Sequence, residues 1–358
     1  MSLRKRCYQT LGLILALGVW ACGSDITGPD NGNFDAETTA AGLEVVDGAF
    51  STPAFASLEA LGGAFGVPGA APPAAAAAML RAAGDPNAAD FSERISEAAS
   101  GFLASRAAAA IVLIPEDYRS LTLTYDPEEG YAVDSTRTEA PSNGIRFILY
   151  AVNPITHEIT EPLTEIGYAD LTDESTETFA AIGLEVVSDD VTYLDYTVTL
   201  SGTIVTPVFT VSGFITDGTD RADFTLSQGY AVNIAGITIN IDYEIAVNDF
   251  SMDVALEIVQ TNDENETVAV DISFSDGSDI ATIIGSTENQ EGVLEVRGNG
   301  VLFATITLTD SSVTVLDGEG EPLTAEEIQT LQELIEVIDE VGDLCEDLLH
   351  PVEFLFDD

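Results

Sequence analysis

Residues 237–258 read ITINIDYEIAVNDFSMDVALEI, and this stretch decides the fold class. Its first half alternates strictly between apolar and polar side chains, with Ile237, Ile239, Ile241, Tyr243, Ile245 and Val247 in one phase and Thr238, Asn240, Asp242, Glu244 and Ala246 in the other. Successive side chains of a strand point to opposite faces of a sheet. The stretch therefore predicts a strand with one apolar face and one solvated face. Met252, Val254, Leu256 and Ile258 repeat the alternation after a short Asn-Asp turn.

The same period of two extends from Leu121 over almost two hundred residues. Short Asn, Asp and Gly turns separate the strands, which favours antiparallel neighbours in a meander over residues 115–322. A flat sheet of about a dozen strands is atypical, so we expect curling into a half-barrel or closure into a barrel. The further strands predicted are 145–152, 191–200, 208–215, 222–227, 268–274, 293–297, 301–308 and 313–316.

Helices are predicted before and after the strands in the sequence. Thr324 and Glu327 form a capping box, and Pro351 ends an amphipathic helix over residues 323–350. Its apolar stripe contains Ile328, Leu331, Leu334, Ile335, Ile338, Val341, Cys345 and Leu348. An alanine-rich segment, residues 36–114, predicts two to four helices with breaks at 51–53, 66–73 and 84–87. The expected fold is α+β: a large curved antiparallel sheet whose apolar face the C-terminal and N-terminal helices cover.

The first 21 residues have the pattern of an export signal. Arg4, Lys5 and Arg6 precede a short apolar run that ends at Trp20. The end of this run and the two residues after it, Val19-Trp20-Ala21-Cys22, resemble the lipobox of bacterial lipoproteins, in which a small residue precedes a cysteine that becomes acylated. The resemblance implies lipidation of Cys22. The composition after the cysteine, rich in Gly, Asp, Asn and Pro, favours a solvated tether over residues 22–35. The alternative is an ordinary secretory signal cleaved after Ala21.

The lipobox resemblance also predicts the location. Several acyl chains on Cys22 would anchor the chain to a membrane without a spanning helix, since each buried methylene contributes about 0.8 kcal/mol. Gly23 rather than Asp follows the cysteine, which in bacterial lipoproteins implies sorting to the outer membrane of a diderm cell envelope. Beyond the first residues the chain resembles no characterised family convincingly.

Charge excludes several classes of activity. The chain has 11 Lys plus Arg against 62 Asp plus Glu, a formal net charge of −51. Nucleic acid is excluded as a partner because phosphate binding needs a basic face. The only lysine is Lys5, so P-loop and Schiff-base chemistry are also excluded from the exported chain. Such an acidic surface is typical of proteins from salty environments, and predicts stability that rises with salt.

No catalytic motif emerges, and no cofactor is expected. His157 lies in a turn-like stretch and His350 at the end of the last helix, each without a paired base. Cys345 is on the apolar stripe, where a buried small side chain is favoured over a reactive thiol. The expected protein is not an enzyme; a secreted hydrolase using two carboxylates is the alternative.

Acidic turns are better candidates for a site than the histidines. Oxygen ligands at the hairpin ends could hold calcium, with Asp217, Asp220, Asp276, Asp279, Asp317 and Glu319 as the residues concerned. A solvated acidic surface is favoured over a calcium-binding adhesion module, since turns select Asp and Asn for backbone reasons. No other metal ligands are expected.

The leading hypothesis is a lipid-anchored, non-enzymatic binding or structural module of the cell envelope. In outline the architecture is similar to the half-barrel of lipoprotein-carrier proteins, which hold acyl chains on the concave face. If the helices leave a gap above the sheet, an apolar ligand or lipid is the expected partner. If they fill it, the module is structural. Protein partners cannot be named from the sequence.

Overall fold

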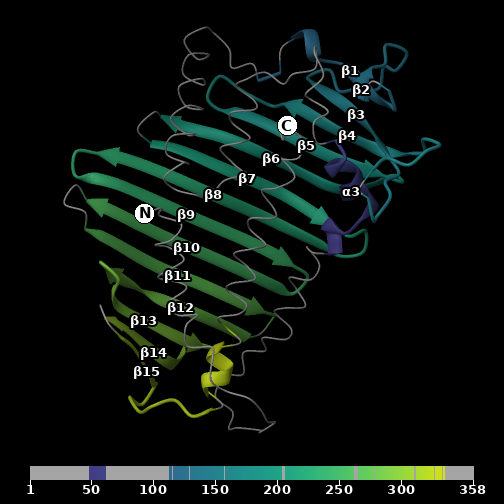
Figure 1. The fold of residues 1–358 in the computed structure, drawn as a ribbon. Coiled ribbons are helices and arrows are strands. Elements are labelled where there is room, and N and C mark those ends of the chain that lie inside the picture. Colours follow the sequence, from purple (N-terminus) through teal and green to yellow (C-terminus); the bar gives the residue numbers. More distant parts are fainter. Residues whose placement is uncertain are drawn as a thin grey trace. The chain divides into compact units, whose positions relative to one another are not determined.

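A computed structural model describes residues 48–61, 113–114, 116–128, 130–156, 158–203, 206–261, 265–277, 279–309, 312–325, 327–332 and 334. The described chain is dominated by a sheet with the strand order β15-β14-β13-β12-β11-β10-β9-β8-β7-β6-β5-β4-β3-β1-β2 (Figure 1). This confirms the large, mainly antiparallel sheet. Because β2 and β15 end the order without a further neighbour, closure into a barrel, one of the two expected outcomes, is wrong.

The strands and the two short helices have the following bounds. The strands are β1 Leu121–Asp126, β2 Gly130–Val133, β3 Gly144–Tyr150, β4 Glu165–Asp173, β5 Ala180–Ser188, β6 Val191–Thr203, β7 Thr206–Thr216, β8 Arg221–Asn233, β9 Gly236–Val247, β10 Phe250–Thr261, β11 Glu266–Asp276, β12 Asp279–Glu288, β13 Glu291–Gly298, β14 Val301–Thr309 and β15 Ser312–Asp317. The helices that lie wholly within the described residues are α3 Pro53–Glu59 and the 3₁₀ turn η2 Glu116–Tyr118. The described residues divide into two compact units, 48–224 and 225–334, within β8.

One pair departs from the expected antiparallel meander. β1 pairs with β2 antiparallel, but β3 returns to lie beside β1 and runs parallel to it, with Leu121 opposite Ile145. Residues 134–143 connect β2 to β3, and they are long enough to cross a strand at about 4.8 Å per spacing. Only a connection of two to four residues would have forced β3 against β2. The expectation that every neighbour is antiparallel is therefore wrong at this end of the sheet.

Tight turns with positive φ fix the register of the hairpins. Both central residues of the Asp189-Asp190, Asn289-Gln290 and Asn299-Gly300 turns have φ between 48° and 80°, as type I′ turns require. Asn299 also reaches beyond its own hairpin. Its backbone N–H donates to the Ile280 carbonyl at 2.7 Å, and its Oδ1 accepts from the Ile280 N–H at 2.9 Å. Asn289 makes the same two bonds with Glu266.

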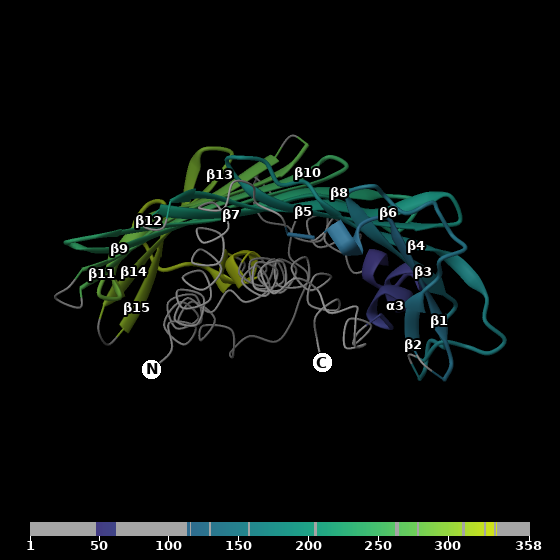
Figure 2. The same cartoon turned by 90° about the horizontal axis from the view of Figure 1, so that it is seen from above.

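The core of unit 48–224 lies on the apolar face of β3–β7. Ile145, Leu171, Leu184 and Tyr196 lie opposite one another on successive strands, and all are at most 4% exposed. Helix α3 contacts β3, β4 and β5 on one side of the sheet (Figure 2). Its Ser57 Oγ accepts a hydrogen bond from the Tyr150 N–H at 3.0 Å. The predicted break at residues 51–53 is confirmed, with Pro53 at the start of α3; the other predicted N-terminal helices lie outside the described residues.

The start of the C-terminal helix is confirmed in unit 225–334. The Thr324 N–H donates to Glu327 Oε2 at 2.7 Å and the Glu327 N–H to Thr324 Oγ1 at 3.3 Å, so the capping box forms. Leu331 and Leu334 of the predicted stripe are buried. Ile328 is 39% exposed, contrary to expectation, because it lies in the first turn after the exposed residues 318–322. Residues 335–350 lie outside the described part.

Candidate functional site: an apolar strip on strands β9 to β11

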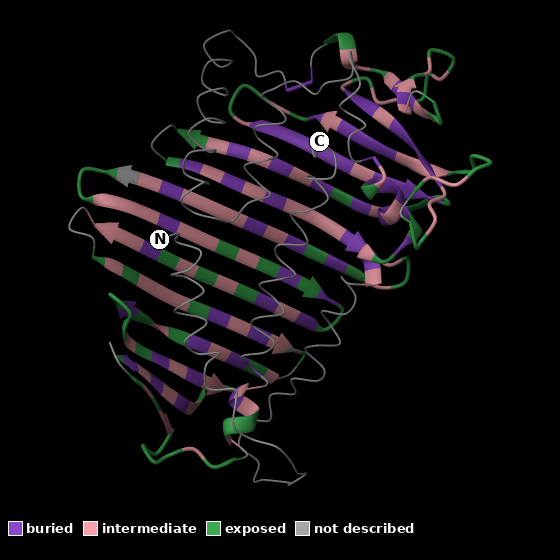
Figure 3. Cartoon of the chain, viewed as in Figure 1, coloured by how far each residue is buried: buried purple, intermediate pink, exposed green. Residues whose placement is uncertain are grey.

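Burial alternates along many of the strands, as the sequence predicts (Figure 3). On β9–β11 of unit 225–334, seven apolar side chains of the inner phase are only partly buried, Ile237 and Val268 among them. The other five lie next to one another in the middle of the strands: Ile241, Tyr243, Val254, Leu256 and Val270. We call these five residues the apolar strip. They are neighbours in the sheet, because Ile241 pairs with Leu256, Tyr243 with Val254, and Leu256 with Val270.

The apolar strip is enclosed by covered neighbours. At one end, Ile245, Met252 and Phe274 lie in register and are at most 5% exposed. At the other end, Ile239 and Ile258 are paired and buried. Beyond this buried pair, Ile237 and Val268 are again partly buried. The strip differs from the apolar face of β3–β7 in the other unit, where the corresponding side chains are buried.

Gln228 lies at the edge of the strip on the same face and is hydrogen-bonded to Tyr243 of the strip. Gln228 is in the phase of the buried Phe224, Leu226 and Tyr230 of β8, so it points to the apolar side. Its Nε2 donates to the Tyr243 hydroxyl at 2.8 Å. Burial, and then the nearby Tyr243, raise the pKa of the Tyr230 hydroxyl, so this phenol stays protonated. An amide and two phenols thus lie at the margin of an otherwise hydrocarbon surface.

The face of β3–β6 opposite the apolar core of the other unit carries a row of charges. Arg146, Asp170, Glu185 and Asp195 lie directly opposite one another on β3, β4, β5 and β6. Arg146 binds Asp170 through two bonds, Nε to Oδ1 at 2.7 Å and Nη2 to Oδ2 at 2.6 Å. Its guanidinium also lies 3.6 Å from the centre of the Tyr168 ring. The hydrogen bond to Asp170 raises the already high pKa of Arg146.

Glu185 is the group in this row with the least favourable surroundings. Partial burial, followed by the charges of Asp170 and Asp195, raises the pKa of its carboxyl above the ordinary value. Asp170 and Glu185 lie directly opposite each other on β4 and β5, so they are candidates for the paired carboxylates of a hydrolase. However, Arg146 engages both oxygens of Asp170. The pair is better explained as a charge ladder on the sheet surface than as an acid and a nucleophile.

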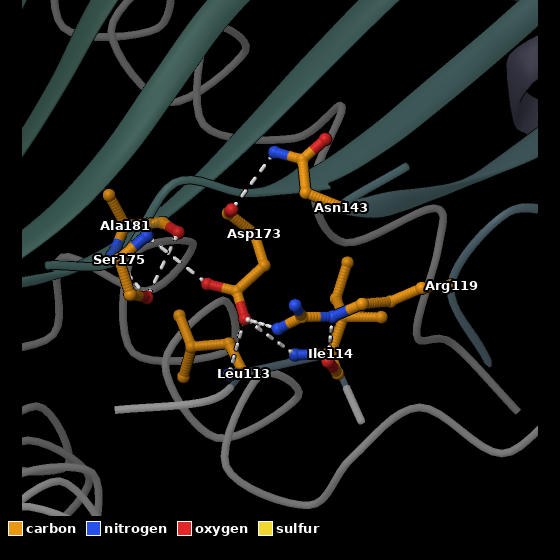
Figure 4. A network of polar contacts seen from close by, with 7 residues as sticks. All are labelled: Leu113, Ile114, Arg119, Asn143, Asp173, Ser175 and Ala181. Carbon is orange, nitrogen blue, oxygen red and sulfur yellow. Dashed lines mark hydrogen bonds and ion pairs between the residues drawn. The ribbon is translucent and has the colours of Figure 1, made fainter. Parts of the chain in front are cut away.

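A second polar network ties the segment before β1 to the sheet (Figure 4). Asp173 Oδ2 accepts from the Leu113 N–H at 2.9 Å, the Ile114 N–H at 3.2 Å and Arg119 Nη2 at 3.1 Å. Its Oδ1 accepts from the Ser175 N–H at 3.1 Å. With a side chain only 3% exposed, Asp173 is a structural anchor that satisfies several donors at once.

Several of the acidic residues considered as calcium ligands accept hydrogen bonds from turn residues. Asp217 Oδ1 accepts from the N–H groups of Thr219 and Asp220, and Asp317 Oδ1 from those of Glu319 and Glu321. Asp279 Oδ1 accepts from Asn299 Nδ2. Asp276 ends β11. Within the described ranges no three His, Cys, Asp or Glu side chains gather closely enough to hold a metal ion.

The remaining candidates of the sequence are not placed. Cys22, Cys345, His157 and His350 all lie outside the described residues. The residues that the sequence argument missed are Gln228 and Asp173. Gln228 had a detectable pattern, since it is a polar residue in the apolar phase of ADFTLSQGYAV; Asp173 is one of 62 acids and carries no such mark.

Comparisons with known proteins give no relative from which a function could be transferred. A scan against protein-family models finds no match, and searches of curated proteins and of solved structures find no significant match either. No helix in the described part of the chain combines the length and the apolar character needed to cross a membrane.

Proposed function

We propose that the protein is a lipid-anchored module of the cell envelope that binds an apolar molecule without transforming it. The apolar strip carries this proposal. Five neighbouring apolar side chains stay partly exposed, while Ile245, Met252 and Phe274 at one end and Ile239 and Ile258 at the other are buried. Leaving such surface open to water costs about 25 cal/mol per Å². A bound hydrocarbon would remove that cost.

The anchor follows from the N-terminal sequence. The apolar run to Trp20 and the Ala21-Cys22 junction support export and acylation. An acylated Cys22 would hold the chain at a membrane surface, in the outer membrane of a diderm cell. The remaining basic residues of the exported chain are all arginine. The five arginines in the described residues all form ion pairs with acids, which supports a membrane contact through lipid rather than through a basic patch.

Native mass spectrometry of the full chain after gentle extraction tests the binding. We expect a population heavier than the acylated polypeptide by the mass of one noncovalent lipid, which is released by collisional activation. The matched variant is Leu256→Asn, which makes the strip polar, and the control is Asp253→Asn on the other face of the same strand. Loss of the adduct in the first variant alone supports the proposal. A bare mass in the wild type contradicts it.

A further inference from the structure

Gln228, at the edge of the apolar strip, has hydrogen-bonding capacity that the described part of the sheet does not use. Gln228 donates one N–H to the Tyr243 hydroxyl, while its Oε1 has no partner among the described residues. A primary amide carries two donors and an acceptor. At the edge of a hydrocarbon surface, this arrangement suits a ligand group that can both donate and accept, such as a hydroxyl.

Charge selects against anionic head groups. From residue 225 to the end of the chain, Arg297 is the only Lys or Arg. Arg297 is bound to Glu295 at 2.7 Å, and both are in the strand phase opposite to the buried Leu294 and Val296. No described cation is therefore available on the strip's face of this unit. A carboxylate or phosphate placed there would find no counter-charge among the described residues and would face the net charge of −51.

Size selects against a protein partner. The strip crosses β9, β10 and β11, two interstrand spacings of about 4.8 Å, and extends over one step of two residues, about 7 Å along each strand. Its area is on the order of 100 Å², whereas a stable protein interface buries about 800 Å² on each partner. A single alkyl chain fits this footprint, but a second copy of the chain does not.

We infer that the strip takes a neutral single-chain amphiphile with a hydroxyl-bearing head, of which a monoacylglycerol is the type. The acyl chain lies across Ile241, Leu256 and Val270, and the head hydroxyl donates to Gln228 Oε1 beside Tyr243. This inference rests on the proposed binding function and adds to it the class of ligand and the residues that select the head.

Photo-crosslinking of the full chain in its membrane tests the inference. The probe is a monoacylglycerol with a diazirine in the acyl chain and an alkyne tag, and adducts are mapped by peptide mass spectrometry. We expect adducts on residues 241–256 and 268–272. Gln228→Leu should lower the labelling at equal probe about tenfold, as loss of one hydrogen bond predicts. Asn240→Leu, the same kind of exchange on the solvated face of β9, should leave it unchanged.

A second variant and a competition experiment test the inference independently of Gln228→Leu. Tyr243→Phe removes the hydroxyl to which Gln228 Nε2 donates and retains the ring, so it frees the amide that receives the head group. If Gln228→Leu does not fold, labelling should fall in Tyr243→Phe instead. Competition by unlabelled monoacylglycerol on the wild type needs no variant and should remove the adducts. Equal labelling of both faces, or equal loss in Asn240→Leu, would overturn the inference.

The probe also separates the two proposals. If a photoreactive fatty acid labels the strip as well as the monoacylglycerol does, the binding function stands and the neutral-head selection is wrong. If neither probe labels the strip, both proposals fall.

Discussion

Removing the Asp173 carboxylate should destabilise the unit of residues 48–224 far more than removing an exposed carboxylate. In Asp173→Ala, the buried N–H groups of Leu113 and Ile114 lose their acceptor, and Arg119 loses its ion-pair partner. Each orphaned donor costs about 1–3 kcal/mol. The lost ion pair costs less than a fully buried one, because water reaches the Arg119 side chain, which is 30% exposed. Because these terms overlap at one side chain, we expect a total loss of about 3–5 kcal/mol.

Asp223→Ala is the matched control. Asp223 also pairs with an arginine, Arg221, but both side chains are more than half exposed, with relative exposures of 55% and 54%. An exposed pair contributes at most about 1 kcal/mol. Urea unfolding followed by far-ultraviolet circular dichroism would measure the loss, and amide hydrogen exchange of residues 113–119 would locate it. Equal destabilisation by the two variants, or unchanged exchange in Asp173→Ala, would refute the assignment of Asp173 as an anchor.

Four other predictions follow from the same contacts. Because the folded-state pKa of Glu185 is raised, its ionisation opposes folding as the pH rises through that pKa; Glu185→Gln should therefore stabilise the protein at pH 7 by up to about 1 kcal/mol and have no effect in acid, as pH-dependent urea unfolding would show. Tyr196→Phe removes a buried hydroxyl that has no hydrogen-bond partner, so the thermal midpoint should rise; a fall would show that the hydroxyl is satisfied. Asn299→Gly keeps the positive φ but loses the side-chain hydrogen bond from the Ile280 N–H, so urea unfolding should show a loss of about 1 kcal/mol in the free energy of unfolding. Asn299→Ala should lose more, because alanine disfavours the positive φ. Molar sodium chloride should raise the melting temperature of the wild type, since it screens the repulsion among acids; a flat profile would contradict this.

The sheet was largely predictable because most strands are buried on one face. β9 and β10 alternate in sequence, and their bounds extend the predicted ranges by one to three residues. β5 was missed because it reads AAIGLEVVS and only Glu185 in it is not buried. A strand covered on both faces has no alternation to detect. The capping box was predictable because both of its partners lie within one helical turn.

The candidate site was predictable only in part. The apolar phase of β9 and β10 marks the strip residues as inward-facing, but the degree of cover depends on what packs above them, which no local pattern encodes. Gln228 could be singled out as a polar residue out of phase, yet its pairing with Tyr243 required the adjacency of β8 and β9. Likewise, the ten residues that connect β2 to β3 allow β3 to pair with either β1 or β2. The parallel pairing of β3 with β1 could therefore not be predicted from the sequence.

Metabolic labelling with an alkyne-tagged palmitate tests the lipid anchor, on which the envelope function depends. The account predicts that the wild-type chain is labelled and sediments with membranes, that Cys22→Ser is unlabelled, and that Cys345→Ser is labelled like the wild type. A wild-type chain that incorporates no palmitate, or one that loses it only in Cys345→Ser, would contradict the account.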